Sequence, residues 1–151
     1  YEIAQCLVGS EMCIRDRVEN ILADFRNRDI PVAVINEHLQ GDLVKFYGVH
    51  GTDFFYWFYP SPCSHSKFGL EKINGIAKGI PFSVEELKIQ SDKAAEALNV
   101  PIYGGDCVVS ADGTLRIIDF NDWPSFARCR EEAGGKIAEC IYNRAKKQMK
   151  Q

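Results

Sequence analysis

The chain has 151 residues, of which 46% are hydrophobic and 26% are charged, with a formal net charge of −3 at pH 7. This is the composition of an ordinary globular domain with its own hydrophobic core. The slight acidic excess argues against nucleic acid or an anionic membrane surface as a partner. No apolar run approaches the roughly 20 residues that a membrane-spanning helix needs. We therefore expect a cytoplasmic protein with no nucleic acid and no membrane partner, and leave a homo-oligomer open.

The front of the chain differs from the rest. Residues 6–17 read CLVGSEMCIRDR, which resembles the in-frame translation of a transposon-based sequencing adapter. A signal peptide does not account for this segment, because charged residues interrupt it and it has no apolar core run. We therefore expect residues 1–17 to be an artefact, and an upstream part of the natural protein to be missing.

Four of the six cysteines lie outside this segment. They form no Cys-x-x-Cys pair and show no metal-like spacing with histidine. We expect reduced thiols that pack as small hydrophobic side chains.

The first predicted elements are a helix, a short strand and a hairpin. Apolar residues at helical spacing predict a helix over 18–28, and a β-branched run predicts a buried strand over 32–35. Two further strands are predicted over 43–49 and 53–59, joined by a tight turn. The second reads DFFYWFY and is apolar on both faces, so we expect it in the centre of a sheet.

The elements that follow are a loop, two helices and a hairpin between them. Residues 60–81 are weakly patterned and predict a loop. Ser83 and Glu86 form a capping box that opens a helix to about Asn99. A last helix is predicted over 130–147, with lysines at its C-terminal end. This order predicts an α+β fold, an antiparallel sheet with flanking helices.

The hairpin between these helices carries the chemically informative residues. Asp112-Gly113 is a strong two-residue turn signal, because both residue types tolerate positive φ. Counting outward from that turn, Asp106 faces Asp119. The same count predicts two further pairs, Ser110 with Leu115 and Val108 with Ile117.

Three oxygen-bearing side chains converge at the open end of this hairpin. Asn121 lies on the same face as Asp119, because side chains alternate along a strand, and Gly104 opposite Asn121 leaves room for a ligand. Two carboxylates directly opposite each other repel, and an oxygen-ligated divalent cation offsets that repulsion. We therefore predict a metal site made of Asp106, Asp119 and Asn121. The alternative is that these are ordinary solvated strand residues.

This arrangement resembles the magnesium site of ATP-grasp enzymes. The match is GGD at 104–106 and IIDFN at 117–121, and the resemblance covers about residues 18–151. It implies that 37–151 is the C-terminal lobe of an ATP-grasp fold, truncated at its N-terminus, and that 18–36 is a remnant of the central lobe.

The resemblance also implies ligands. Asp106, Asp119 and Asn121 would hold one or two Mg²⁺ ions, for which Mn²⁺ can substitute, against the β- and γ-phosphates of ATP. Glu37 would bind the ribose, since a carboxylate accepts hydrogen bonds from two adjacent hydroxyls; the alternative is a surface acid. The nucleotide-binding residues implied in this way are Ile35, Asn36, Glu37, His38, Leu39 and Lys45.

Two cations are expected to act in catalysis. Lys45 lies where the family places a cation toward phosphate, and would counter charge on the transferring γ-phosphoryl group; the alternative is an exposed strand lysine. Arg128, or its neighbour Arg130, would hold an anionic substrate; the alternative for each is a surface cation. We expect Trp123, Pro124 and Phe126 to pack the turn after the hairpin against the last helix rather than to form a stacking platform.

The activity implied by the resemblance is that of a Mg-ATP-dependent carboxylate–amine ligase acting through an acyl-phosphate on a small-molecule or peptide substrate. The motifs are similar to both the ribosomal-protein glutamate ligase or glutathione synthetase branch and the inositol trisphosphate kinase branch, so a hydroxyl kinase is the alternative within the family. A non-catalytic domain that binds a cation or a partner is the alternative of another class. Because the phosphate-binding lysines would lie upstream of residue 18 and no G-x-x-x-x-G-K-[ST] motif is present, we expect this chain alone to be inactive and to bind ATP weakly.

Overall fold

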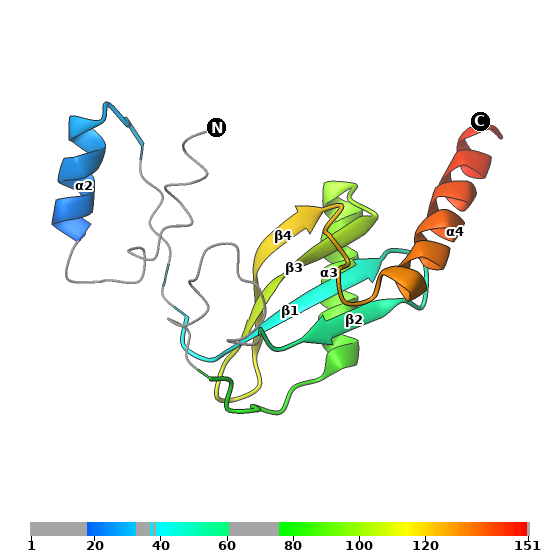
Figure 1. Cartoon of the computed structure of the whole chain (residues 1–151), viewed down its shortest axis with the longest axis horizontal. Helices are drawn as coiled ribbons and strands as arrows, with labels where there is room; N and C mark the ends of the chain where they lie inside the picture. Colours follow the sequence, from blue (N-terminus) through cyan, green and yellow to red (C-terminus); the bar gives the residue numbers. More distant parts are fainter. Residues whose placement is uncertain (1–17, 33–36, 38, 61–75, 151) are drawn as a thin grey trace. The chain divides into compact units, whose positions relative to one another are not determined.

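A computed structural model describes residues 18–32, 37, 39–60 and 76–150 (Figure 1). The chain divides into two units, residues 1–39 and 40–151. The first unit contains helix α2 (Val18–Asn27), which confirms the predicted helix. Of the predicted strand over 32–35, Val32 is described and is not part of a strand, and residues 33–35 lie outside the described residues. None of the helices in the described part of the chain is long and apolar enough to cross a membrane.

In its described residues, the second unit is an α+β domain with a four-stranded antiparallel sheet and two helices, as predicted for the general class. The strands follow one another in the sheet in the order β2-β1-β3-β4. The helices are α3 (Val84–Leu98) and α4 (Arg130–Gln148). The strands are β1 (Asp42–Val49), β2 (Phe55–Phe58), β3 (Ile102–Val109) and β4 (Leu115–Asp122).

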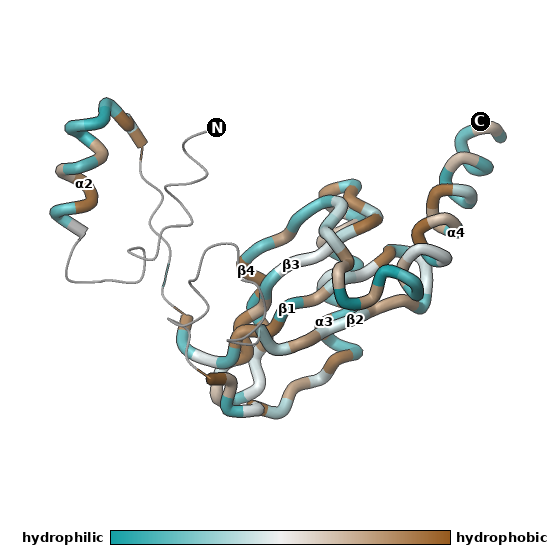
Figure 2. Tube along the Cα trace, viewed as in Figure 1, coloured by the Kyte–Doolittle hydropathy of each residue, from teal (hydrophilic) through white to brown (hydrophobic). Residues whose placement is uncertain are grey.

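Each face of the sheet has its own hydrophobic cluster. Helix α3 crosses one face, and the start of α4 lies against part of the other (Figure 1). Figure 2 shows α4 passing from hydrophilic residues through a hydrophobic middle to a hydrophilic end, and every residue of α4 from Ile141 onward is exposed. The α3 cluster is Val44, Phe46, Leu87, Ala95, Tyr103, Cys107, Val109 and Leu115. The α4 cluster is Val49, Phe54, Ile102, Phe126, Cys129, Ala133 and Cys140.

The position of the aromatic strand in the sheet was predicted wrongly. β2 lies at the edge, and among the described residues it pairs only with β1. Its rings nevertheless cover both faces: Phe55 stacks on Phe46 with ring centroids 5.9 Å apart, and Tyr56 stacks on Tyr47 at 6.5 Å. An apolar pattern on both sides of a strand therefore reports covered faces, and does not require a neighbouring strand at each edge.

Helix α3 begins and ends where its sequence predicts. The side chain of Ser83 accepts a hydrogen bond from the backbone N–H of Glu86 at 3.1 Å, which satisfies one free donor of the first turn. The Glu86 carboxylate accepts from Gln90 Nε2 at 3.1 Å, one turn further along the helix. Asn99 ends the helix in the left-handed conformation with φ of 55°.

The β3–β4 hairpin has the predicted pairing at its open end only. Asp106 pairs with Asp119 and Gly104 with Asn121, as predicted. Nearer the turn the pairing shifts by one residue, so the predicted pairs Val108–Ile117 and Ser110–Leu115 are wrong. The observed pairs there are Cys107–Ile117, Val108–Arg116 and Val109–Leu115.

A different turn type causes this shift. Within the turn only Gly113 has positive φ, 82°, and its N–H donates to Ser110 O at 2.8 Å. Ser110 N donates to Thr114 O at 3.0 Å, so the connection is a three-residue loop with glycine at the left-handed position. A β-bulge at Ile118 then moves the register back by one residue before Asp119. The extra loop residue and the bulge cancel, so Asp106 pairs with Asp119 as predicted.

A buried tyrosine ties α3 to the centre of the sheet. The Tyr103 ring lies over Gly48, where a Cβ atom would be 2.3 Å from Tyr103 Cζ. The Tyr103 hydroxyl donates to Asp92 Oδ1 at 2.8 Å, and Asp92 Oδ2 lies 2.6 Å from Lys88 Nζ. This network satisfies the polar atoms that the buried tyrosine brings into the core.

Asp42, at the start of β1, holds the segment that leads into α3. Its buried carboxylate accepts the backbone N–H groups of Lys78 and Ile80, both at 2.8 Å. Burial raises the pKa of Asp42, but hydrogen bonds from the backbone N–H groups of Ile80, Lys78 and Gly79 outweigh it, and the pKa is lowered.

Replacing Asp42 with Asn is expected to lower the free energy of unfolding by about 1–3 kcal/mol at pH 7, because Asn has one neutral acceptor oxygen and leaves one of the two backbone N–H groups without an acceptor. A carboxyl group with a lowered pKa stabilises the fold above its ordinary pKa, and that contribution is lost as the pH falls through its folded-state pKa. Urea unfolding should therefore show a smaller difference in the free energy of unfolding between the wild-type chain and Asp42→Asn at pH 3 than at pH 7. Asp122→Asn, at an exposed position, is the control, and a gap that does not depend on pH would contradict this account.

Candidate functional site

One row across the sheet gathers most of the predicted site residues. Directly paired residues in antiparallel strands point to the same face. The pairs Phe58–Lys45, Lys45–Asp106 and Asp106–Asp119 therefore place four side chains in one line across all four strands. Asn121 lies on the same face, two residues further along β4. We call Lys45, Asp106 and Asp119, with Asn121 beside them, the charged row; it lies on the face opposite α3.

Lys45 and Asp106 form an ion pair within the charged row. Lys45 Nζ lies 2.9 Å from Asp106 Oδ1 and 3.0 Å from Oδ2, so one ammonium group contacts both carboxylate oxygens. The side chains are 30% and 23% exposed, respectively, so water screens the pair only in part. The lysine predicted to face phosphate therefore holds one of the predicted metal ligands.

The ion pair does not fully compensate the Asp106 carboxylate. Burial raises the pKa of Asp106, the charge and hydrogen bond of Lys45 lower it, and the neighbouring charge of Asp119 raises it again. The net result is a raised pKa, which means that the fold favours the protonated form. The charged row also contains two carboxyl groups and only one ammonium group, so Lys45 pairs with Asp106 and leaves Asp119 without a cation in the row.

Asp119 and Asn121 complete the donor set on β4. Asn121 Nδ2 donates to Asp119 Oδ2 at 2.5 Å, and both residues are exposed. Two carboxylates and an amide oxygen are hard donors of the kind Mg²⁺ takes, and this ion keeps several waters rather than requiring a full protein cage. Within the described ranges, no group of three or more His, Cys, Asp or Glu side chains is placed to hold a metal ion. An ion at this row would need the Asn121 oxygen together with water or ligand oxygens.

The expected space above Gly104 is filled. A Cβ atom at Gly104 would lie 2.8 Å from Tyr47 Cδ1 and 2.9 Å from Pro124 Cγ. The prediction that this glycine leaves room for a ligand is therefore wrong: it allows Tyr47 and Pro124 to pack against the sheet.

Arg128 lies at the β2 end of the charged row. Its guanidinium carbon is 4.2 Å from the centroid of the Phe58 ring, a cation–π contact, and Phe58 is the strand partner of Lys45. The structure thus brings the two predicted catalytic cations to one part of the sheet. Arg130, the other arginine considered, donates from Nε to Ser125 O at 3.4 Å.

The turn after β4 was predicted correctly for Phe126 and wrongly for Trp123. Phe126 is buried with its ring centroid 5.2 Å from that of Tyr47, whereas Trp123 is 62% exposed. Both have positive φ, 49° and 44°, which bulky residues rarely adopt. Two contacts hold the turn in this unfavourable backbone conformation. They are the packing of Phe126 and a hydrogen bond from Trp123 N to Ile102 O at 2.9 Å.

The predicted adenine- and ribose-binding residues belong to another part of the chain. Ile35, Asn36 and His38 lie outside the described residues. Glu37 is exposed and Leu39 is half-buried; both belong to the unit 1–39, whereas the charged row belongs to the unit 40–151. Their role in nucleotide binding stays a prediction.

The described cysteines are not candidates for nucleophilic chemistry. Cys107, Cys129 and Cys140 are free thiols and buried, as predicted for small hydrophobic side chains. Burial raises the pKa of all three, to about 11 for Cys107. A thiol that stays protonated is a poor nucleophile.

The pairing of Lys45 with Asp106 was not predicted from the sequence. β1 and β3 are separated by β2 and α3 along the chain, so no turn between them allows a register to be counted. One chemical signal is available: Lys45 is the only basic residue of β1. A lone cation on a half-buried strand predicts an acidic partner on a neighbouring strand.

Asp106→Asn is expected to raise the midpoint of thermal unfolding at pH 7 by about 2–6 °C, because the fold disfavours the ionised carboxylate. A carboxyl group with a raised pKa favours the folded state below its ordinary pKa, and this stabilisation is lost as the pH rises through the folded-state pKa. The gain from the substitution should therefore shrink as the pH is lowered to 3.5, opposite to the behaviour of Asp42. If Asp106→Asn lowers the midpoint more than the control Asp122→Asn does at pH 7, the ion pair stabilises the fold and this account is wrong.

Comparisons with known proteins found no match: no family model, no curated protein and no solved structure matches this chain. The likeness to ATP-grasp enzymes therefore rests on the motifs GGD at 104–106 and IIDFN at 117–121.

Proposed function

We propose that residues 40–151 are the metal- and phosphate-holding lobe of an ATP-grasp enzyme, a Mg-ATP-dependent carboxylate–amine ligase that acts through an acyl-phosphate. The observation that carries this proposal is the charged row itself. Lys45, Asp106 and Asp119 lie side by side on three neighbouring strands, with Asn121 on the same face.

The order of charges along the row supports a complex of a cation with a polyanion as the ligand. Arg128 and Lys45 lie toward β2, and Asp119 and Asn121 lie toward β4, with Asp106 between them. A metal–phosphate complex has the same polarity, with its cation facing the carboxylates and its phosphate oxygens facing the basic side chains.

Each residue has a distinct task under this proposal. Asp106, Asp119 and Asn121 would hold the divalent cation, which supplies neutralisation of phosphate charge when bound. Lys45 would orient the terminal phosphate, and Arg128, held on the Phe58 ring, would position an anionic substrate group at the end of the row. The carboxylate and amine acceptors are assigned by the resemblance alone.

The cellular setting is part of the same proposal. A cytoplasmic location suits an ATP-dependent enzyme, and the free, buried thiols of Cys107, Cys129 and Cys140 are compatible with a reducing compartment.

The test compares two exposed carboxylates on β4 that point to opposite faces. Asp119 lies in the charged row, whereas Asp122 is the strand partner of Tyr103, which packs in the α3 cluster, and therefore points to the α3 face. Asp119→Ala is expected to weaken binding of the Mn²⁺–ATP complex by roughly ten-fold or more, since it removes a charged ligand, and Asp122→Ala should leave it unchanged. Electron paramagnetic resonance of Mn²⁺ in the presence of ATP measures this binding even when it is weak.

Two controls make the result interpretable. Far-ultraviolet circular dichroism and the unfolding midpoint should be alike in the two variants, because both positions are exposed. Equal loss of Mn²⁺–ATP binding in both, or no loss in either, would sink the assignment of the row as the nucleotide–metal site.

A further inference from the structure

We infer that Lys45 is the resident counter-ion of Asp106 and has to leave it before a divalent cation can bind there, so that the charged row takes a cation–polyphosphate complex rather than the free cation. This inference rests on the proposed function and adds how the site selects the form of its ligand.

The ion pair obstructs a free cation in two ways. Lys45 Nζ contacts both oxygens of Asp106, at 2.9 and 3.0 Å, so the carboxylate already has a cationic partner. A divalent ion placed between Asp106 and Asp119 would also lie within a few ångströms of the ammonium group, and the two positive charges repel at a partly screened site. Free Mg²⁺ or Mn²⁺ therefore has to compete with Lys45 for the Asp106 carboxylate.

A polyphosphate removes this obstruction. The Lys45 side chain is 30% exposed, and its flexible stem allows the ammonium group to move without a change in the strand. Its strand partner Phe58 carries the Arg128 guanidinium at 4.2 Å from the ring centroid. An anion bound by Arg128 and Lys45 draws Lys45 away from Asp106, which then faces the cation that the same anion carries.

Cation and polyphosphate binding are therefore coupled through one side chain. Because such coupling is reciprocal, each should raise the affinity for the other beyond their attraction in solution. Lys45 thus acts as a positioning residue for the metal and as a direct contact for the phosphate.

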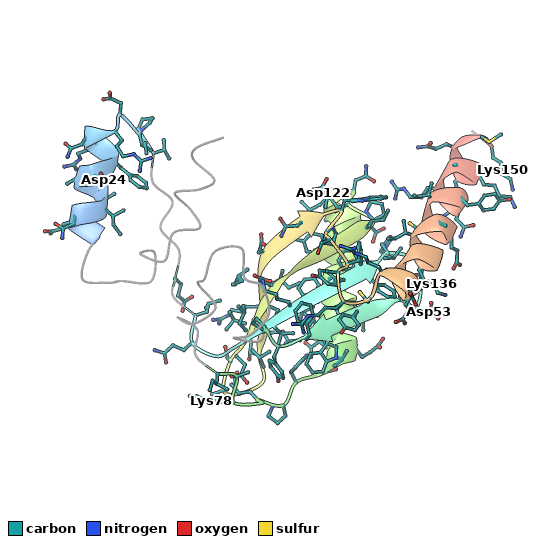
Figure 3. The ribbon with its side chains drawn as sticks, viewed as in Figure 1. Asp24, Asp53, Lys78, Asp122, Lys136 and Lys150 are labelled. Atoms are coloured by element: carbon teal, nitrogen blue, oxygen red, sulfur yellow. The ribbon has the colours of Figure 1, made fainter. Side chains whose placement is uncertain are left out.

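The main experiment measures the affinity of the full chain for Mn²⁺ alone by electron paramagnetic resonance. Lys45→Met keeps the length of the side chain and removes its charge, and it should bind free Mn²⁺ at least about ten-fold more tightly than the wild-type chain. The matched control is Lys136→Met: Lys136 pairs with Asp53 at 2.5 Å at the start of α4 (Figure 3), away from the charged row. This control removes the same charge and should leave Mn²⁺ affinity within about two-fold of the wild-type value.

A second measurement uses the preformed complex of Mn²⁺ with inorganic triphosphate, titrated by calorimetry. The wild-type chain should bind this complex more tightly than free Mn²⁺, and Lys45→Met should lose most of that preference because it lacks the phosphate contact. A lysine with a purely structural role would leave the preference unchanged.

The outcomes separate this inference from the proposed function. If Lys45→Met binds free Mn²⁺ no more tightly than Lys136→Met, while Asp106→Asn still weakens Mn²⁺ binding, the counter-ion role is overturned and the proposed metal site stands. If Asp106→Asn changes Mn²⁺ binding in neither the wild-type nor the Lys45→Met background, the metal site itself is wrong and the inference falls with it.

Discussion

The pairing of β1 with β3 is the constraint on which the rest of the domain depends. The two strands pair over eight residues at the centre of the sheet, and three consecutive pairs each join an aromatic residue to a glycine. A Cβ atom at any of these glycines would lie less than 3.0 Å from the ring of its partner, so a shift in register brings a ring against a residue with a side chain. The three pairs are Phe46–Gly105, Tyr47–Gly104 and Gly48–Tyr103.

The candidate site is a consequence of that register. Once Phe46 is seated on Gly105, the adjacent pair has to be Lys45 with Asp106, and the β3–β4 hairpin then adds Asp119 to the same row. One of these rings, that of Tyr47, fills the space above Gly104 together with Pro124, whereas Asp119 and Asn121 on the same face stay exposed. The same strand pairing thus determines both the aromatic packing and the position of the charged row. The turn before Arg128 adds a second cation at the β2 end of the row.

Local signals predicted the elements well and the long-range pairings poorly. Ser83 and Asn99 mark the ends of α3 because capping is decided within one turn of the helix. The alignment of Asp106 with Asp119 was predicted correctly although the turn type was wrong, because the bulge at Ile118 compensates the extra loop residue. The edge position of β2 and the Lys45–Asp106 pair depend on contacts between segments far apart in sequence, which neither turn chemistry nor periodicity reports.

Paramagnetic broadening shows residue by residue whether a divalent cation binds at the charged row. Substoichiometric Mn²⁺ added to the ¹⁵N-labelled chain with inorganic triphosphate broadens amide signals near the ion. We expect the signals of residues 104–106 and 119–121 to broaden first, with that of Lys45 close behind. Broadening that begins instead among the acidic residues at the start of α4, such as Glu131 and Glu132, or that spreads evenly over the domain, would contradict the account.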